Sequence, residues 1–274
     1  MRLFLSGLGK LRRRPATYVT FGLLAGLLVL IMIAVGVTRG VGGNGGGGNG
    51  GGGGGNALLL LTFPGAYDLI LSFILGLGGL FAVIYGAAVA GSEWSWGTLK
   101  TIVARGESRT RYMVATFAAI AVVVTVGLLV TFLIAVPVAA FSASIAGVSL
   151  DGLGDMATLG RLPEQFARGT LAIVTQGALG FAVASLARSQ LAGIGVGIAV
   201  YFGGTFAGIF LPDVVKYLPF QLASAVVGGP GGGGFGGGTA PSVSPDLAAV
   251  LLAVWLVGCV VVAAGFTERA EITG

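Results

Sequence analysis

The side chains of this sequence that could take part in chemistry are few, and they avoid the middle of its apolar segments. The chain has no histidine and a single cysteine, Cys259. Imidazole acid–base chemistry, His-ligated metal sites and an intrachain disulfide are therefore excluded. Asp68, Glu93, Arg168 and Arg188 stand where apolar segments begin or end. The lack of mid-segment charge argues against a proton-coupled transporter and against an intramembrane protease with paired carboxylates.

A phosphate-binding loop of the Walker A type does not occur in the sequence. Gly9-Lys10 is followed by Leu11 instead of Ser or Thr, and no GK[ST] follows the glycine-rich run 42–55. We therefore expect that the chain is not an enzyme and binds no cofactor or metal. If it takes part in active transport, ATP must be hydrolysed on another subunit.

The composition places the chain in a membrane. Hydrophobic residues make up 55% and charged residues 9% of the 274 residues, and the mean hydropathy is +0.98. Soluble domains carry about 25% charged residues. A soluble globule is excluded because the chain lacks polar surface, and disorder is excluded because it requires low hydrophobicity.

Six apolar segments have the length of about 20 residues that crosses a bilayer. They cover about 18–37, 69–91, 112–141, 169–187, 191–211 and 247–266. The third is longer than needed, which predicts a tilt or a bend at Pro137. The first is too long for a cleaved signal, whose apolar run is roughly 7–15 residues. The fold class is an all-α integral membrane protein with six transmembrane helices in one domain, 1–274.

The distribution of Lys and Arg predicts the orientation. With the N-terminus inside, eleven of the 15 basic residues face the cytoplasm and four face outward, which satisfies the positive-inside rule. We therefore expect a multi-pass protein of the plasma membrane with both termini in the cytoplasm. The predicted membrane-interface and topology residues are Lys10, Arg12, Arg13, Arg14, Trp94 and Arg188. The basic start, 1–17, is expected to form an interfacial helix and to contact anionic lipid headgroups instead of nucleic acid.

Glycine, with 52 residues, is used in two ways. Glycine-rich outer loops are expected at 38–66 and 228–246, as flexible solvated segments. Pairs of glycines four residues apart, at 22 and 26, 193 and 197, and 204 and 208, predict close packing of helices.

The loop 92–111 between the second and third spans carries the most information. Leu99, Ile102 and Val103 lie on one face of a short helix. Gly106 ends this helix, and Ser108 can cap the next one. Trp94 and Trp96 suit the membrane–water interface, with the indole N–H in the wet layer. The loop is either an inert interfacial helix or a docking element for a partner.

The pattern Glu93-Trp94-x-x-Gly97-Thr98-Leu99-Lys100, followed by Arg105-Gly106-x-Ser108-Arg109, resembles the first cytoplasmic loop of type 2 ABC exporter permeases. Lys10 to Tyr18 is similar to the N-terminal helix of that family, and Tyr217-Leu218-Pro219 lies where the family has short re-entrant outer helices. The resemblance implies a coupling helix that docks on an ATPase subunit. The ATPase-coupling residues that it implies are Glu93, Trp96, Gly97, Thr98, Leu99, Arg105 and Arg109.

The resemblance implies the membrane-spanning permease subunit of an ABC transporter, an exporter. Its partners would be a cytoplasmic ABC ATPase that binds ATP, a second permease subunit, identical or different, and membrane lipid. Two other interpretations remain open. A self-sufficient channel or secondary transporter predicts internal repeats and polar sites within spans. A non-transporting scaffold would not require a docking element for an ATPase.

Overall fold

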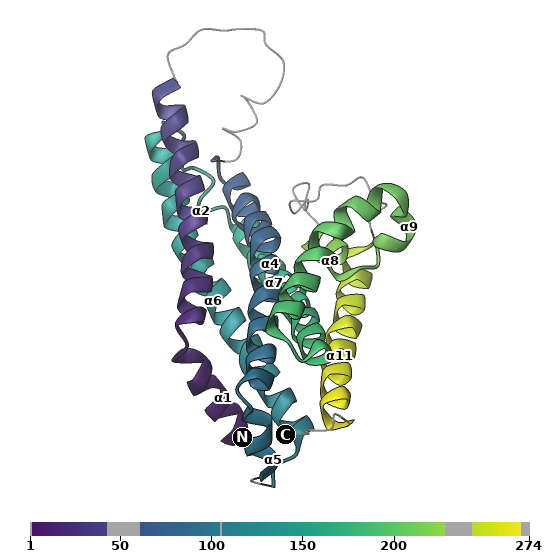
Figure 1. Cartoon of the computed structure of the whole chain (residues 1–274). Helices are drawn as coiled ribbons and strands as arrows, with labels where there is room; N and C mark the ends of the chain where they lie inside the picture. Colours follow the sequence, from purple (N-terminus) through teal and green to yellow (C-terminus); the bar gives the residue numbers. More distant parts are fainter. Residues whose placement is uncertain (1, 43–60, 105, 228–242, 270–274) are drawn as a thin grey trace.

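Helices make up all the regular secondary structure in the described residues, which are 2–42, 61–104, 106–227 and 243–269 of a computed structural model. Figure 1 shows their arrangement. The helices are α1 (Arg2–Arg12), α2 (Pro15–Gly42), α4 (Gly65–Ser95), α5 (Thr98–Ala104), α6 (Arg109–Ile145), α7 (Met156–Ala187), α8 (Gln190–Phe210), α9 (Pro212–Val215), α10 (Pro219–Val227) and α11 (Pro245–Arg269).

Six of these helices are long and apolar enough to cross a membrane: α2, α4, α6, α7, α8 and α11. Each contains one of the six apolar segments identified in the sequence. The prediction of six membrane-spanning helices in an all-helical chain is confirmed at this level. The chain is therefore a multi-pass membrane protein by the length and composition of its helices.

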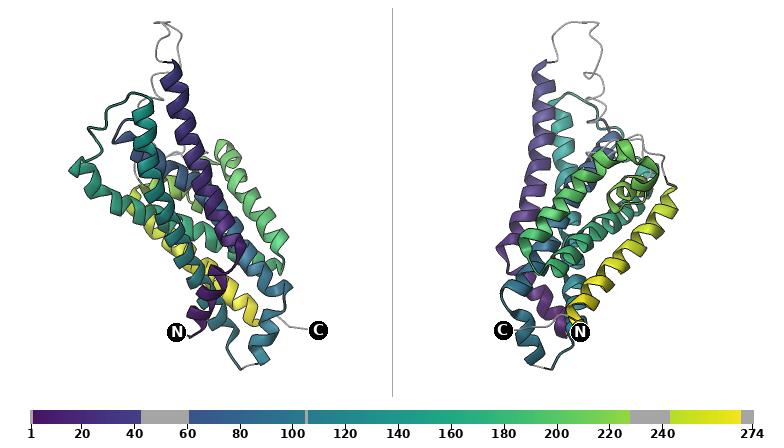
Figure 2. Two further views of the ribbon diagram at one scale, coloured as in Figure 1. Left: turned by 90° about the vertical axis from the view of Figure 1, so that its left-hand side faces the viewer. Right: turned by 45° about the vertical axis from the view of Figure 1, so that its right-hand side comes forward.

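Helices α4 and α7 form the centre of the bundle. In the most apolar 18-residue stretch of each, 67% of the residues are buried, compared with 22% in α2 and 18% in α8. Helices α2 and α6 lie on one side of this central pair, and α8 and α11 lie on the other (Figures 1 and 2). The short helix α10 packs against α7 and α11.

The central pair approaches backbone to backbone at glycine. A Cβ atom on Gly86 of α4 would lie 2.2 Å from the carbonyl oxygen of Gly177 of α7. A Cβ atom on Gly180 of α7 would lie 2.2 Å from the carbonyl oxygen of Val83. Small residues at such positions let helices pack closely in lipid, where dispersion forces and not water drive association.

The glycine pairs identified in the sequence differ in their surroundings. Gly193 and Gly197 of α8 pack tightly, because added Cβ atoms would meet Ala184 and Val83 at 2.4 and 2.2 Å. The prediction of close packing is wrong for the pair at 204 and 208, because an added Cβ atom would meet nothing within 4 Å at Gly204 and nothing nearer than 3.8 Å at Gly208. The prediction of close packing is wrong for Gly22 and Gly26, where an added Cβ atom would meet nothing within 4 Å. These two glycines face outward from α2. They leave the surface of that helix without side chains at these positions and do not pack it against a neighbour in this chain.

Several helices extend beyond their apolar segments. Helix α7 begins at Met156, well before the predicted start at 169. The hydropathy of the sequence missed its first turns because they carry polar residues. Helix α6 is continuous through Pro137. Helix α2 continues to Gly42, α4 begins at Gly65 and α11 begins at Pro245, so 38–42, 65–66 and 245–246 are helical and not part of the predicted loops. The remaining glycine-rich runs, 43–55 and 228–238, lie outside the described residues.

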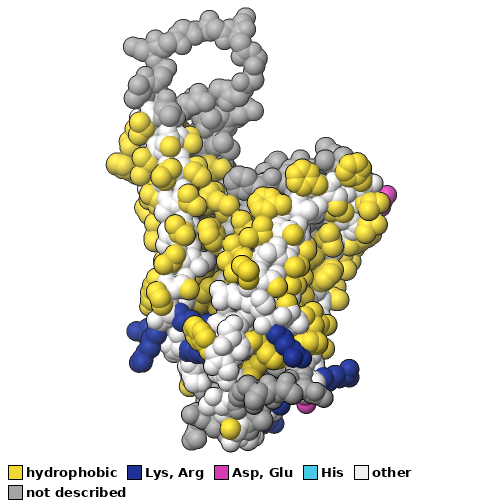
Figure 3. All heavy atoms as spheres, viewed as in Figure 1, with side chains coloured by type: hydrophobic (Ala, Val, Ile, Leu, Met, Phe, Trp, Pro, Cys, Tyr) yellow, Lys and Arg dark blue, Asp and Glu magenta, His cyan; other side chains and the backbone are white. Residues whose placement is uncertain are grey.

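One end of the bundle carries α1, α5, the turn between α7 and α8, and the last turn of α11; we call it the α5 end (Figure 1). On the face shown in Figure 3, hydrophobic side chains cover the sides of the bundle, and the Lys and Arg side chains gather near the α5 end. This separation of apolar walls from a basic end is typical of a protein that spans a membrane.

At the opposite end, Asp155 caps α7. Its carboxylate accepts hydrogen bonds from the N–H groups of Ala157 and Thr158 and from the hydroxyl of Thr158. These bonds lower the pKa of Asp155 from its ordinary value, the Thr158 hydroxyl having the largest effect. The cap therefore persists down to this lowered pKa and is lost when the pH falls through it.

We expect Asp155→Ala to raise the hydrogen-exchange rates of the Ala157 and Thr158 amides severalfold, because these N–H groups lose their acceptor. Asp155→Asn, which keeps an acceptor oxygen, should retain most of the protection. Equal exchange in the alanine variant and the unaltered protein would show that the cap contributes nothing.

Candidate functional site

The site is built around a sharp corner between α1 and α2. Pro15 opens α2, a position that suits proline because its missing N–H needs no partner in the first turn. Two residues on, the hydroxyl of Thr17 donates to the carbonyl of Leu11 at 2.8 Å and lies 2.8 Å from the hydroxyl of Tyr85 of α4. The corner is thus fastened to α4 inside the bundle.

Next to this corner lies the Glu93 cluster, which consists of Lys10, Arg14, Ser92, Glu93 and Tyr112. Lys10 Nζ donates to the two carboxylate oxygens of Glu93 at 2.6 and 2.9 Å. The Tyr112 hydroxyl donates to Glu93 Oε2 at 2.6 Å. Arg14 donates to Glu93 Oε1 at 3.2 Å and to the Ser92 hydroxyl at 3.0 Å. One carboxylate therefore joins α1, the corner, α4 and α6.

The cluster is buried around its carboxylate. The side chain of Glu93 is 1% exposed, while those of Arg14 and Lys10 are 14% and 35% exposed. A buried carboxylate is costly to desolvate unless it is paired and hydrogen-bonded, and here two cations and a hydroxyl meet it. The pairing favours one arrangement of the three helices, because separation would leave a buried charge without partners.

Helix α5 follows immediately after the cluster. Gly97, with φ of 64°, and Gly106, with φ of 76°, stand on either side of it in the left-handed region that glycine adopts without strain. Leu99 is 2% exposed, and Ile102 packs against the core, so this face holds α5 to the bundle. Thr101 and Ala104 are exposed.

A second set of contacts joins other elements at the α5 end. The guanidinium of Arg188, in the α7–α8 turn, lies 5.3 Å from the ring centre of Trp94 and 5.6 Å from that of Phe266. Arg14 lies 4.9 Å from the ring centre of Trp96. Thr110 of α6 donates to Glu268 of α11 at 2.6 Å. Cation–π contacts of this kind add to the cohesion of the α5 end.

The structure separates the residues singled out in the sequence into buried and exposed groups. Glu93 and Leu99 are buried, so neither can touch a partner directly in this arrangement. Trp96 is 66% exposed. The indole N–H of Trp94 is buried, contrary to its expected place in the wet layer, because Trp94 packs against the core. Ser108 caps α6 by accepting from the N–H of Arg111 at 3.4 Å, as the sequence indicates.

The remaining sequence-selected residues occupy different places. Gly97 and Thr98 form the entry to α5, and Arg109 begins α6. Arg105 lies outside the described residues. Lys10 and Arg14, taken from the sequence as topology residues, prove to be partners of Glu93. Sequence reasoning missed Tyr112; the one signal for it was a tyrosine in the first turn of the third span, where an interfacial hydroxyl is common.

Within the described part of the chain, no group of three His, Cys, Asp or Glu side chains gathers where a metal ion could bind. The polar chemistry of the Glu93 cluster is that of an ion-paired joint between helices. Neither its geometry nor its burial leaves room for a reacting molecule at the carboxylate, since every carboxylate oxygen is already bonded to protein donors.

The family model described as "Protein of unknown function (DUF2705)" matches residues 60–272. The chain belongs to the DUF2705 family. No curated protein matches the chain.

The DUF2705 match divides the Glu93 cluster. Ser92, Glu93 and Tyr112 lie within residues 60–272, as do α5 and Arg188, whereas Lys10 and Arg14 precede the matched region. The acidic half of the ion-paired joint thus belongs to the part of this chain that matches DUF2705, and its basic half is contributed by α1 and by the corner between α1 and α2, in front of that part.

Proposed function

We propose that this chain is the membrane-spanning permease subunit of an ABC transporter, with α5 as the element that docks on a separate ATPase. The observation that supports this proposal is the placement of α5. This helix is anchored by a buried face and leaves Thr101 and Ala104 exposed at the α5 end, and Trp96, just before it, is exposed as well. An exposed helix on a rigid support is a suitable docking surface.

The Glu93 cluster would transmit a movement of α5 to the neighbouring helices. Glu93 lies in the last turn of α4, just before α5, and it is bonded to α1, the corner and α6. A displacement of α5 would therefore be transmitted through Glu93 to α1, to the corner between α1 and α2 and to α6. ATP binding would close a pair of ATPase subunits, and two permease subunits would change their packing between discrete arrangements. By the resemblance to type 2 ABC exporter permeases the direction is export, through the plasma membrane, with the α5 end and both termini in the cytoplasm.

The first test is purification of the tagged protein from its own host in mild detergent, with identification of co-purifying chains. We expect an ATPase that carries a Walker A sequence, in amounts equal to the permease. Adding charge to the exposed side of α5 with Ala104→Glu should reduce the recovered ATPase at least tenfold, because burying an unpaired charge in an interface costs more than the about 1.4 kcal/mol that a tenfold loss requires.

The matched control is Ala157→Glu, which adds the same charge at an exposed alanine at the other end of the bundle. It should leave ATPase recovery unchanged, and both variants should elute as folded protein on size exclusion. If the unaltered protein is recovered without any ATPase, under conditions that preserve a known ABC complex, the permease proposal fails and a channel or scaffold becomes the better interpretation.

A further inference from the structure

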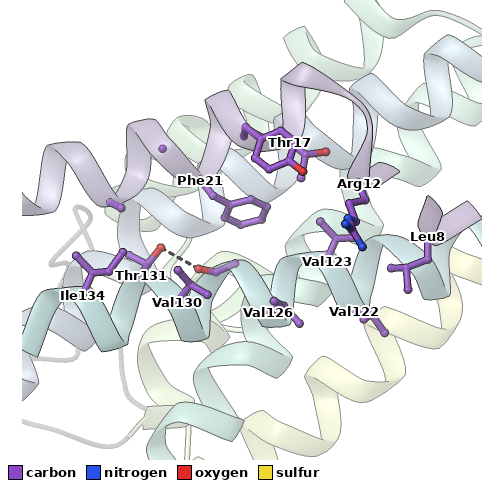
Figure 4. A pocket seen from close by; sticks show the side chains of 14 residues that line it. Leu8, Arg12, Thr17, Phe21, Val122, Val123, Val126, Val130, Thr131 and Ile134 are labelled. Atoms are coloured by element: carbon purple, nitrogen blue, oxygen red, sulfur yellow. Dashed lines mark hydrogen bonds between the residues drawn. The ribbon is translucent and has the colours of Figure 1, made fainter. Parts of the chain in front are cut away.

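A groove runs along the outer surface of the bundle between α2 and α6, and α1 bounds one end of it (Figure 4). Its volume is about 560 Å³, within the range of roughly 300–1,000 Å³ that is typical of small-molecule sites. Its walls are apolar, with Tyr18, Phe21 and Gly22 on α2 and Val122, Val126 and Val130 on α6.

The groove exists because each of its two walls has a glycine where a larger side chain would fill the space. Gly22 faces open space, since an added Cβ atom would meet nothing within 4 Å. On the other wall, the ring of Phe21 lies against Gly127, where an added Cβ atom would come within 2.4 Å of Cδ1. Phe21 can therefore fold onto α6, and the surface beside it remains hollow.

A single cation stands at the α1 end of the groove. Arg12, the last residue of α1, is exposed and lines the groove beside Val123 and Leu8 (Figure 4). Lys10 and Arg14 are bonded to Glu93, whereas Arg12 forms no salt bridge to any of the residues described. A guanidinium binds a phosphate through two parallel hydrogen bonds, which makes Arg12 suited to an anionic headgroup.

The length of the groove matches that of a lipid acyl chain in one leaflet. The α6 wall runs from Val122 to Ile134, about 18 Å at the rise of an α-helix. One leaflet of the hydrocarbon core is about 15 Å thick, half of the roughly 30 Å core.

We propose that this groove binds one acyl chain of an anionic phospholipid, whose phosphate is held by Arg12. The bound lipid would join α1 and α2 to α6 from outside. The same corner is fastened from inside by the Glu93 cluster. The lipid would thus stabilise the packing of the first two helices on the rest of the bundle.

The test uses delipidated full-length protein in detergent, titrated with phosphatidylglycerol or phosphatidylcholine of identical acyl chains, with bound lipid counted by native mass spectrometry. We expect one phosphatidylglycerol to bind in preference to phosphatidylcholine. Arg12→Gln should weaken phosphatidylglycerol binding about tenfold, because a charge-assisted hydrogen-bond pair is lost. Arg13→Gln is the matched control, since Arg13 is exposed on the same corner without lining the groove.

A second pair of variants tests the groove itself. Gly22→Trp should fill it and weaken the binding of both lipids, whereas Gly265→Trp, at an equally open glycine of α11, should weaken neither. Equal loss of phosphatidylglycerol in Arg12→Gln and Arg13→Gln would overturn the assignment of the headgroup. Displacement of the lipid by glycerol phosphate, which has no acyl chains, would overturn the role of the groove. A lipid-free dimer that Gly22→Trp disrupts would show that a second copy of the chain is the occupant.

Discussion

Replacing Glu93 with glutamine is expected to lower the thermal unfolding midpoint of the purified protein more than any other conservative substitution at the α5 end. The carboxylate is 1% exposed and is bonded to Lys10, Arg14 and Tyr112. Removing one partner from a buried ion pair costs about 3–5 kcal/mol, because the other charges stay behind. At roughly 2–4 °C per kcal/mol for a chain of this size, we expect a decrease of roughly 6–20 °C, measured with a thiol- or dye-based melting assay in detergent.

The control for this substitution is Glu107→Gln, which neutralises an exposed carboxylate beyond α5 and should shift the midpoint little. A double variant gives a sharper test. Lys10→Met combined with Glu93→Gln should cost less than the sum of the two single substitutions, because each single substitution breaks the same ion pair. Strict additivity would contradict the ion-paired joint, and so would equal midpoints for the Gln variants at 93 and 107.

Gly86→Ala is expected to destabilise the bundle even though alanine is the better helix former. The added Cβ atom would lie 2.2 Å from the carbonyl oxygen of Gly177 and 3.3 Å from the backbone nitrogen of Phe181. Neither atom belongs to a side chain that can rotate away, so α4 and α7 must separate. Overpacking of this kind costs about 1–3 kcal/mol or more, and Gly86→Val should prevent recovery of folded protein.

Gly265→Ala is the matched control, because Gly265 lies in the membrane-spanning helix α11 and an added Cβ atom there would meet nothing within 4 Å. The same chemical change should leave that midpoint unchanged or raise it slightly, since alanine has the higher helix propensity by about 1 kcal/mol. The two variants are therefore expected to shift the midpoint in opposite directions. Similar shifts would mean that the close approach of α4 and α7 does not limit side-chain size.

The membrane helices could be predicted from the sequence because hydropathy depends on local composition. Each of the six apolar segments is a helix, and Gly106 and Ser108 mark the boundary between α5 and α6. The start of α7 could not be found this way. Arg161, Glu164 and Arg168 lie in its first turns, so the helix begins in a polar stretch that resembles a loop in composition.

The Glu93 cluster could not be predicted, because it depends on how helices cross. In the sequence, Lys10 and Arg14 are equally consistent with residues that set the membrane topology, and Glu93 is equally consistent with a surface residue of a docking loop. Only the packing of the corner against α4 and α6 buries the carboxylate between them. The same limit applies to glycine. Gly22 and Gly86 look alike in sequence, yet one faces open space and the other touches a neighbouring backbone.

The separation of the cluster's partners along the chain bears on biosynthesis. Lys10 and Glu93 are 83 residues apart. A ribosome that adds about 5–20 residues per second needs about 4–17 s to make the segment between them. During that interval the basic corner has been synthesised while its buried counter-charge does not yet exist. The first span is therefore expected to enter the bilayer before the surfaces of α4 and α6 on which it packs have been synthesised. Until then, the insertion machinery or acidic lipid headgroups must accommodate the charges of Lys10 and Arg14.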